Sequence, residues 1–116
     1  MKLAIVGSRG FNDYDLLCDT IEEHFDIKEI THIVSGGARG ADALGERFAD
    51  DFGIGKIIFP AQWNLYGKRA GFLRNRDIIK TCDQCVAFWD GESHGTKHDI
   101  ELCEEYNKPC LVIKYK

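Results

Sequence analysis

The sequence predicts an α/β fold in which helices cover both faces of a five-stranded parallel sheet. Short apolar runs alternate along the chain with amphipathic stretches, the pattern of repeated strand–helix units. The apolar runs are continuous and do not alternate with polar residues, as is typical of strands that are buried on both faces. Right-handed crossovers leave few topologies, and we expect the strand order 3-2-1-4-5. This arrangement is a Rossmann-like three-layer sandwich.

Each element follows from its own pattern. The five apolar runs are predicted strands at Leu3–Gly7, Thr31–Ser35, Lys56–Phe59, Gln84–Trp89 and Pro109–Lys114. The four amphipathic stretches are predicted helices at Asp13–Phe25, Ala41–Phe52, Arg69–Lys80 and Thr96–Asn107. We expect Ala61–Ala70, between the third strand and the third helix, to be irregular.

Length and charge limit the possible functions. The 116 residues predict one domain, 1–116. A formal net charge of −4 argues against general duplex DNA binding, which depends on a basic face. No apolar run is long enough to cross a bilayer, and the apolar start is too short for a signal peptide. The sequence therefore predicts a cytoplasmic protein without a membrane partner, and it leaves a homo-oligomer open.

The five cysteines include a C-x-x-C pair, Cys82 and Cys85. A metal site built on such a pair normally needs a second ligand pair at short spacing, and the chain has none. A redox pair usually opens a helix, whereas Cys85 leads into an apolar run. We therefore expect reduced, buried thiols without a metal or a disulfide.

Three polar loops follow predicted strands 1, 2 and 4, and each leads toward a helix. They are Gly7-Ser8-Arg9-Gly10, Ser35-Gly36-Gly37-Ala38-Arg39-Gly40-Ala41-Asp42 and Asp90-Gly91-Glu92-Ser93-His94-Gly95-Thr96. The predicted strand order brings all three to one crevice. Helix N-termini and glycine backbone attract anions, and Arg9 and Arg39 could add charged phosphate contacts. The alternative is that the glycines only form tight turns. None of the loops is a dinucleotide or Walker motif, so we expect no cofactor.

The segment from Trp63 to Arg76 is basic in an otherwise acidic chain. Trp63 and Tyr66 could stack on a base, and Arg74 and Arg76 could hold phosphate. The competing interpretation is a packed loop with Trp63 in the core and the arginines in solvent.

Thr96 and Asp99 have two interpretations as well. Thr96 could cap the last helix in a T-x-x-D box with Asp99, or both residues could contact a ligand. The expected helix start places Asp99 in the first turn, where free N–H groups favour the ionised carboxylate.

The chain resembles a known family in four stretches: GSRGF, SGGARGAD, FPAQWNLYGKRAGFLRNRD and AFWDGESHGTKHDI. Together, in this order and spacing, they are similar to the YspA-like subfamily of the SLOG superfamily. That superfamily is Rossmann-like and includes the LOG phosphoribohydrolases and DNA-processing protein A. The resemblance implies binding of nucleotides or nucleotide-derived ligands.

Two stretches resemble motifs of the LOG enzymes. Gly36–Gly40 is similar to their GGxxG, and Gly95–Asp99 is similar to their GTxxE with aspartate replacing glutamate. Their catalytic arginine lies on the helix after the third strand, which corresponds to Arg74 or Arg76 here. The proline and double glycine that precede their GT are absent from this chain.

These observations predict a module that binds a nucleotide-type phosphate ligand, as a sensor or sequestering protein. The predicted ligand contacts are Gly7, Ser8, Arg9, Gly36, Gly37, Arg39, Gly40, Trp63, Arg76, Gly95 and Thr96. One alternative is an N-glycosidic hydrolase in which Asp99 or Glu92 assists cleavage and Arg74 holds the phosphate. A second alternative is single-stranded DNA binding through Lys68–Arg76.

Overall fold

The computed structural model describes all residues 1–116 and contains one five-stranded parallel sheet with the order β3-β2-β1-β4-β5. This confirms the predicted α/β fold and its strand order. The strands are β1 (Lys2–Gly7), β2 (His32–Ser35), β3 (Gly55–Ile58), β4 (Gln84–Trp89) and β5 (Cys110–Lys114). In register, Gly7 at the end of β1 pairs with Phe88 of β4, and Ala4 pairs with Val34 of β2. The carboxyl ends of the three central strands therefore lie at one edge of the sheet.

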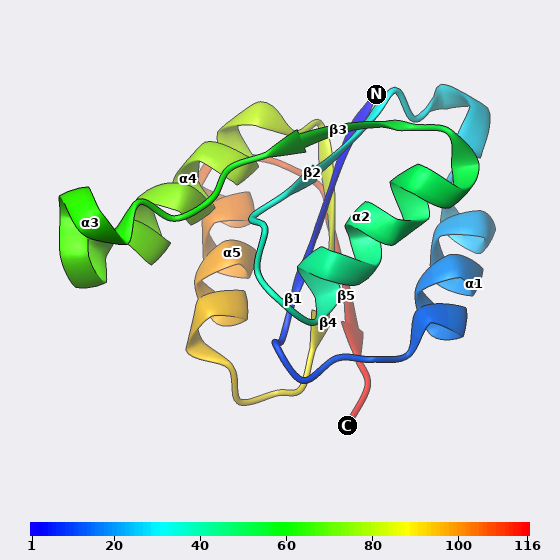
Figure 1. The fold of residues 1–116 in the computed structure, drawn as a ribbon. Coiled ribbons are helices and arrows are strands. Elements are labelled where there is room, and N and C mark those ends of the chain that lie inside the picture. The colour runs from blue at the N-terminus through cyan, green and yellow to red at the C-terminus, as the bar shows by residue number, and fades with distance from the viewer.

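Helices cover both faces of the sheet, with α1 and α2 on one side and α4 and α5 on the other (Figure 1). The helices are α1 (Tyr14–His24), α2 (Ala41–Phe52), α3 (Trp63–Tyr66), α4 (Ala70–Thr81) and α5 (His94–Glu105). Short 3-10 turns, η1 (Ile27–Glu29) and η2 (Gly67–Arg69), complete the chain. None of the helices combines the length and the apolar character that spanning a membrane requires.

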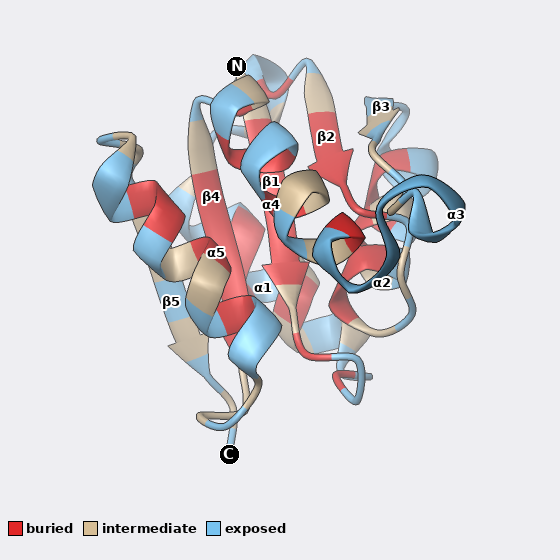
Figure 2. Cartoon of the chain, turned by 90° about the vertical axis from the view of Figure 1, so that its left-hand side faces the viewer, coloured by how far each residue is buried: buried red, intermediate tan, exposed pale blue.

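The core has two parts because successive residues of a strand point to opposite faces. Leu3 and Ile5 of β1 pack toward α1 and α2, whereas Ala4 and Val6 pack toward α4 and α5. All four side chains are fully buried or nearly so, and Figure 2 shows the central strands as a buried layer between the helices. Burial on both faces thus explains the continuous apolar runs of β1, β2 and β4, whereas the edge strands β3 and β5 are only partly buried.

The last helix begins earlier than its sequence indicates. Ser93, not Thr96, is the N-cap of α5, and its Oγ accepts a hydrogen bond of 3.4 Å from the Thr96 backbone N–H. Both residue types are good N-caps, and the loop before Ser93 is fixed by Asp90, which decides between them. As a result Asp99 lies in the second turn of α5, away from the free N–H groups of the first turn.

The segment Ala61–Ala70 is more regular than expected. It forms the single-turn helix α3 and the turn η2, which begins at Gly67, where a φ of +58° suits glycine. This segment projects from the body of the molecule (Figure 1). Trp63 is 51% exposed, so it does not belong to the core.

Candidate functional site

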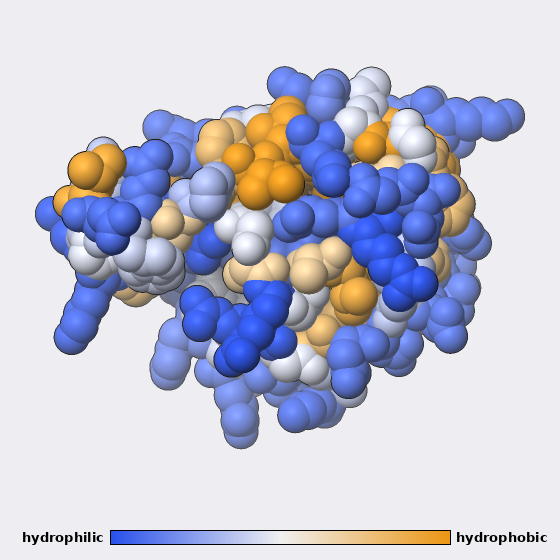
Figure 3. All heavy atoms as spheres, viewed as in Figure 1, coloured by the Kyte–Doolittle hydropathy of each residue, from blue (hydrophilic) through white to orange (hydrophobic).

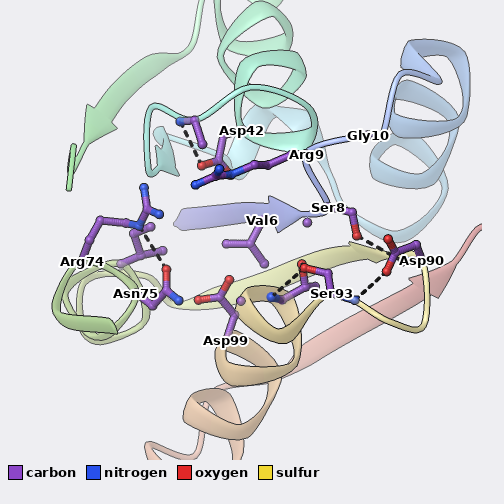
Figure 4. A pocket seen from close by; sticks show the side chains of 15 residues that line it. Val6, Ser8, Arg9, Gly10, Asp42, Arg74, Asn75, Asp90, Ser93 and Asp99 are labelled. Carbon is purple, nitrogen blue, oxygen red and sulfur yellow. Dashed lines mark hydrogen bonds between the residues drawn. The ribbon is translucent and has the colours of Figure 1, made fainter. Parts of the chain in front are cut away.

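A crevice of about 410 Å³ opens where the loops after β1, β2 and β4 meet. Its position, at the carboxyl ends of strands where the order of the sheet reverses, is the usual ligand site of open α/β folds. Figure 4 shows side chains from the loop after β1, from α2, from α4 and from the start of α5 around it. The lining residues are Val6, Gly7, Ser8, Arg9, Gly10, Ala38, Asp42, Arg74, Asn75, Ile78, Asp90, Ser93, Gly95, Thr96 and Asp99.

Ser8 holds the loops together at one end of the crevice. Its backbone carbonyl accepts hydrogen bonds from Phe11 (3.1 Å) and from Ala41 at the start of α2 (3.3 Å). Its Oγ accepts a bond of 3.2 Å from the Asp90 backbone N–H after β4. The buried Ser8 therefore sets the relative positions of three segments that are distant in sequence.

Asp90 shapes the entry to α5. Its carboxylate accepts hydrogen bonds from the backbone N–H groups of Glu92 (2.9 Å) and Ser93 (2.8 Å). These two bonds lower the pKa of Asp90, so this side chain is ionised and its carboxylate is used in hydrogen bonds within the loop. Glu92 itself is exposed and does not line the crevice.

Two side chains of α4 form the opposite wall. Arg74 donates from Nη1 to the Gly36 carbonyl (2.8 Å) and from Nε to Asn75 Oδ1 (3.0 Å). The Asn75 amide in turn lies 3.3 Å from Nδ1 of His98 on α5. The Arg74 guanidinium is thus held in place by the loop after β2, by α4 and, through Asn75, by α5.

Two carboxyl groups are buried in this site, Asp42 on α2 and Asp99 on α5. Burial raises the pKa of Asp42 to about 6, against the opposing effects of the Ala38 N–H donor and the Arg74 charge. Burial also raises the pKa of Asp99 well above its ordinary value, and the charge of Asp42 adds to this shift. Burial thus favours the neutral form of the Asp99 carboxyl, in contrast to the prediction that helix N–H groups would favour its ionised form.

One oxygen of the Asp99 carboxyl has no hydrogen-bond partner. This oxygen, Oδ1, is buried, although Asp99 faces the open space beside Asn75 and Ser93 (Figure 4). A buried carboxyl oxygen without a partner costs on the order of 1–3 kcal/mol. A ligand group that donates to, or accepts from, Asp99 would remove this cost.

Unused cationic and N–H groups lie on the same crevice. Arg9 forms no hydrogen bond or ion pair within the chain. The backbone N–H groups of Arg9, Gly10 and Gly95 also donate no hydrogen bond. A side chain at Gly10 or Gly95 would meet open space, so these two backbone segments are accessible to a ligand.

A second hollow of about 350 Å³ adjoins the crevice and shares Arg9, Ala38 and Arg74 with it. It extends toward the projecting α3, where Trp63 forms part of its wall. In Figure 3, strongly hydrophilic side chains border the hollow between α3 and the body of the molecule. The complete lining is Arg9, Gly36, Gly37, Ala38, Arg39, Pro60, Ala61, Trp63 and Arg74.

The structure divides the residues predicted from sequence into three groups. One group lines the crevice and consists of Gly7, Ser8, Arg9, Arg74, Gly95, Thr96 and Asp99. A second group lines the adjoining hollow and comprises Gly36, Gly37, Arg39 and Trp63, with Arg9 and Arg74 common to both. The third group lines neither space: Gly40 packs against the loop after β1, Glu92 is exposed, and Arg76 borders a separate hollow near Lys80.

Sequence reasoning missed Asp42 and Asn75 as site residues. Asp42 stands in the quoted SGGARGAD stretch, but at the second position of a helix a carboxylate is ordinary. Only its burial, at 7% exposure, distinguishes it from a surface aspartate. Asn75 has no signal in the sequence beyond its position next to Arg74.

Comparisons with known proteins agree with this architecture. Residues 1–66 match the model of the family described as "YspA, cpYpsA-related SLOG family". The Gene 61 protein of Mycobacterium phage D29 is 31% identical over 117 residues, which cover 95% of this chain and 94% of the phage protein.

One solved structure shares the fold across the whole chain. DNA processing protein A from Helicobacter pylori, described for its single-stranded DNA binding mode, superposes with a TM-score of 0.62 at 19% identity. The match covers 100% of this chain and 66% of that protein, so the chain spans about two thirds of its length. The family match and the phage relative, and not this structural likeness, show that the chain belongs to the YspA, cpYpsA-related SLOG family.

Proposed function

We propose that the crevice binds a nucleotide or nucleotide-derived ligand, and that the protein acts as a sensor or sequestering module for it. The Asp99 carboxyl carries this proposal, because it lines the crevice and its Oδ1 has no hydrogen-bond partner within the chain. The crevice and the adjoining hollow, of about 410 and 350 Å³, each lie in the size range of small-molecule sites.

The distribution of charge suggests how such a ligand would lie. The Arg9 guanidinium and the free N–H groups of Gly10 and Gly95 form the anion-binding side, which suits a phosphate. Asp42 and Asp99 form the other side, where sugar hydroxyl groups can exchange hydrogen bonds with carboxyl oxygens. Trp63, on the wall of the second hollow, offers a flat apolar face to a base.

Calorimetric titration with a panel of nucleoside monophosphates and nucleotide-derived compounds tests this proposal. We expect at least one compound to bind, and Arg9→Ala to weaken its binding by about tenfold or more, since a charged hydrogen bond contributes about 1.5–3 kcal/mol. Arg47→Ala is the matched control, because Arg47 lies on α2 and pairs with Asp51 outside the crevice. Equal affinity in wild type and Arg9→Ala for every binder would contradict the role of Arg9.

A second candidate is hydrolysis of the N-glycosidic bond of such a ligand. Burial favours the protonated form of Asp99, which could give its proton to the departing base as the C–N bond breaks and water bonds to the sugar carbon. The proton that the water loses would then return to Asp99. Arg74, fixed against Gly36, would hold the phosphate. The exposed Glu92 is less well placed for the same role.

Chromatography for free base after incubation with nucleoside monophosphates separates cleavage from binding. If the protein is a hydrolase, Asp99→Asn and Arg74→Ala should each abolish release. Loss of base release in Glu92→Gln but not in Asp99→Asn would identify Glu92, and not Asp99, as the general acid. Tight binding of the same compounds without turnover would leave a binding module.

Single-stranded DNA is a further candidate, favoured by the exposed aromatic residues of α3. Trp63 and Tyr66 are each 51% exposed, and Lys68 and Arg69 follow in η2. Stacked bases and neighbouring cations are how single strands are commonly held. A gel-shift assay with oligonucleotides tests this: binding should fall with rising salt and be lost in Trp63→Ala/Tyr66→Ala, while Arg9→Ala should have the smaller effect.

A further inference from the structure

Three cysteines meet at the end of the sheet opposite the crevice. Cys85 is the second residue of β4, Cys110 begins β5, and Cys103 lies in the last turn of α5. Their sulfur atoms all lie within 4.8 Å of one another. No short spacing in the sequence joins them, because Cys103 is 18 residues after Cys85 and 7 before Cys110.

The fold dictates this meeting. Cys85 and Cys110 are partners in the parallel register of β4 and β5, so their side chains leave the same face of the sheet. That face is covered by α5, and all three cysteines pack in the same core cluster (Figure 2 shows α5 beside β4 and β5). Cys85 and Cys103 are buried, whereas Cys110 is half-buried and gives the cluster access to solvent.

We propose that Cys85, Cys103 and Cys110 bind one thiophilic metal ion of the Zn²⁺ class through their three sulfur atoms, and that Cys82 is not a ligand. A metal–sulfur distance of about 2.3 Å places sulfur ligands about 3.8 Å apart, so the present arrangement needs only small side-chain rotations to coordinate an ion. Soft thiolate ligands select soft cations over Mg²⁺ or Ca²⁺. Three ligands leave a fourth, open position for water or a small ligand.

The charge of the ion fits the burial of the site. Metal binding releases thiol protons, and the resulting thiolates would be too costly in an apolar core without a cation among them. Cys82 precedes Cys85 in the C-x-x-C pair, but it donates its own hydrogen bond to the Ile79 carbonyl (3.4 Å) and lies outside the trio. The C-x-x-C spacing therefore does not define the ligand set.

Titration of the reduced full-length protein with Cd²⁺, a spectroscopic substitute for Zn²⁺, tests the proposal. We expect an ultraviolet cadmium–thiolate band that saturates at one ion per chain and that Zn²⁺ displaces. Cys103→Ser and Cys110→Ser should each weaken binding by at least about tenfold, since even loss of an outer-shell partner costs that much. Cys82→Ser and Cys18→Ser are the matched controls and should bind Cd²⁺ as the wild type does.

A second measurement does not depend on a buried substitution. The half-buried thiols of Cys110 and Cys18 should both react with iodoacetamide in the native protein. The ion should slow labelling of Cys110 at least about tenfold, as expected for a ligand, and leave Cys18 unchanged. Absence of the thiolate band at excess Cd²⁺, unaltered affinity in Cys110→Ser, or loss of binding in Cys82→Ser would each overturn the proposal.

Discussion

Nη1 of Arg74 donates a hydrogen bond of 2.8 Å to the Gly36 carbonyl, joining α4 to the loop that follows β2. The two residues are 38 positions apart, and the contact exists because Gly36 has no side chain. A Cβ at Gly36 would lie 2.5 Å from Nη1 of Arg74 and 2.8 Å from Oδ2 of Asp42. The glycine therefore makes room for an arginine and an aspartate together.

The first prediction follows from this contact. Gly36→Ala should displace the Arg74 guanidinium and weaken ligand binding in the crevice about as much as Arg74→Ala does, measured by calorimetry with the same ligand. The guanidinium is the end of a flexible side chain, so the free energy of unfolding should change by only about 1 kcal/mol, within the usual range for single substitutions. Gly71→Ala, on α4 in ordinary contact with Trp63, is the control and should retain binding.

The second prediction concerns Gly40, the N-cap of α2, whose φ is +78°. A Cβ there would clash with the carbonyl oxygens of Ser8 and Arg9. Gly40→Ala should therefore destabilise the protein by about 1–3 kcal/mol from backbone strain, with the clash adding to that loss. Urea denaturation measures the effect. An unfolding midpoint equal to that of Gly71→Ala would show that the loop relaxes freely.

The third prediction concerns the pH dependence of stability. The pKa of Asp42 is raised from 3.8 to about 6, so the folded state disfavours the ionised carboxylate. The stabilising contribution of this group is therefore fully present below the pKa of the unfolded state. As the pH rises through about 6, this contribution is lost, and the free energy of unfolding falls by roughly 3 kcal/mol at most.

Asp42→Asn removes this titration while keeping an oxygen that can accept from the Ala38 N–H. The variant should be more stable than the wild type at pH 8 and should lose that advantage near pH 4, as measured by urea denaturation at each pH. Asp19→Asn, on the exposed side of α1, is the control and should show no such crossover. A constant difference between Asp42→Asn and wild type across this range would contradict the raised pKa.

The sequence alone determined the sheet and the place of the crevice. Short apolar runs bounded by turn residues predict strands, and the loops after strands 1, 2 and 4 meet once the order is 3-2-1-4-5. The helix Ala41–Phe52 was predicted with the bounds it has, since amphipathic spacing and Gly53 define them locally. These are local signals, and they need no knowledge of distant contacts.

Tertiary structure decided which side chains are buried together, because burial depends on segments that are distant in the chain. It buried Asp42 and Asp99, and this burial raises two carboxyl pKa values that the sequence would leave ordinary, against the opposing charge of Arg74. It chose Ser93 over Thr96 as the cap of α5 because Asp90 fixes the preceding loop. It also gathered three cysteines from two strands and a helix, whose spacing carries no motif, since strand register and helix packing alone bring their sulfur atoms together.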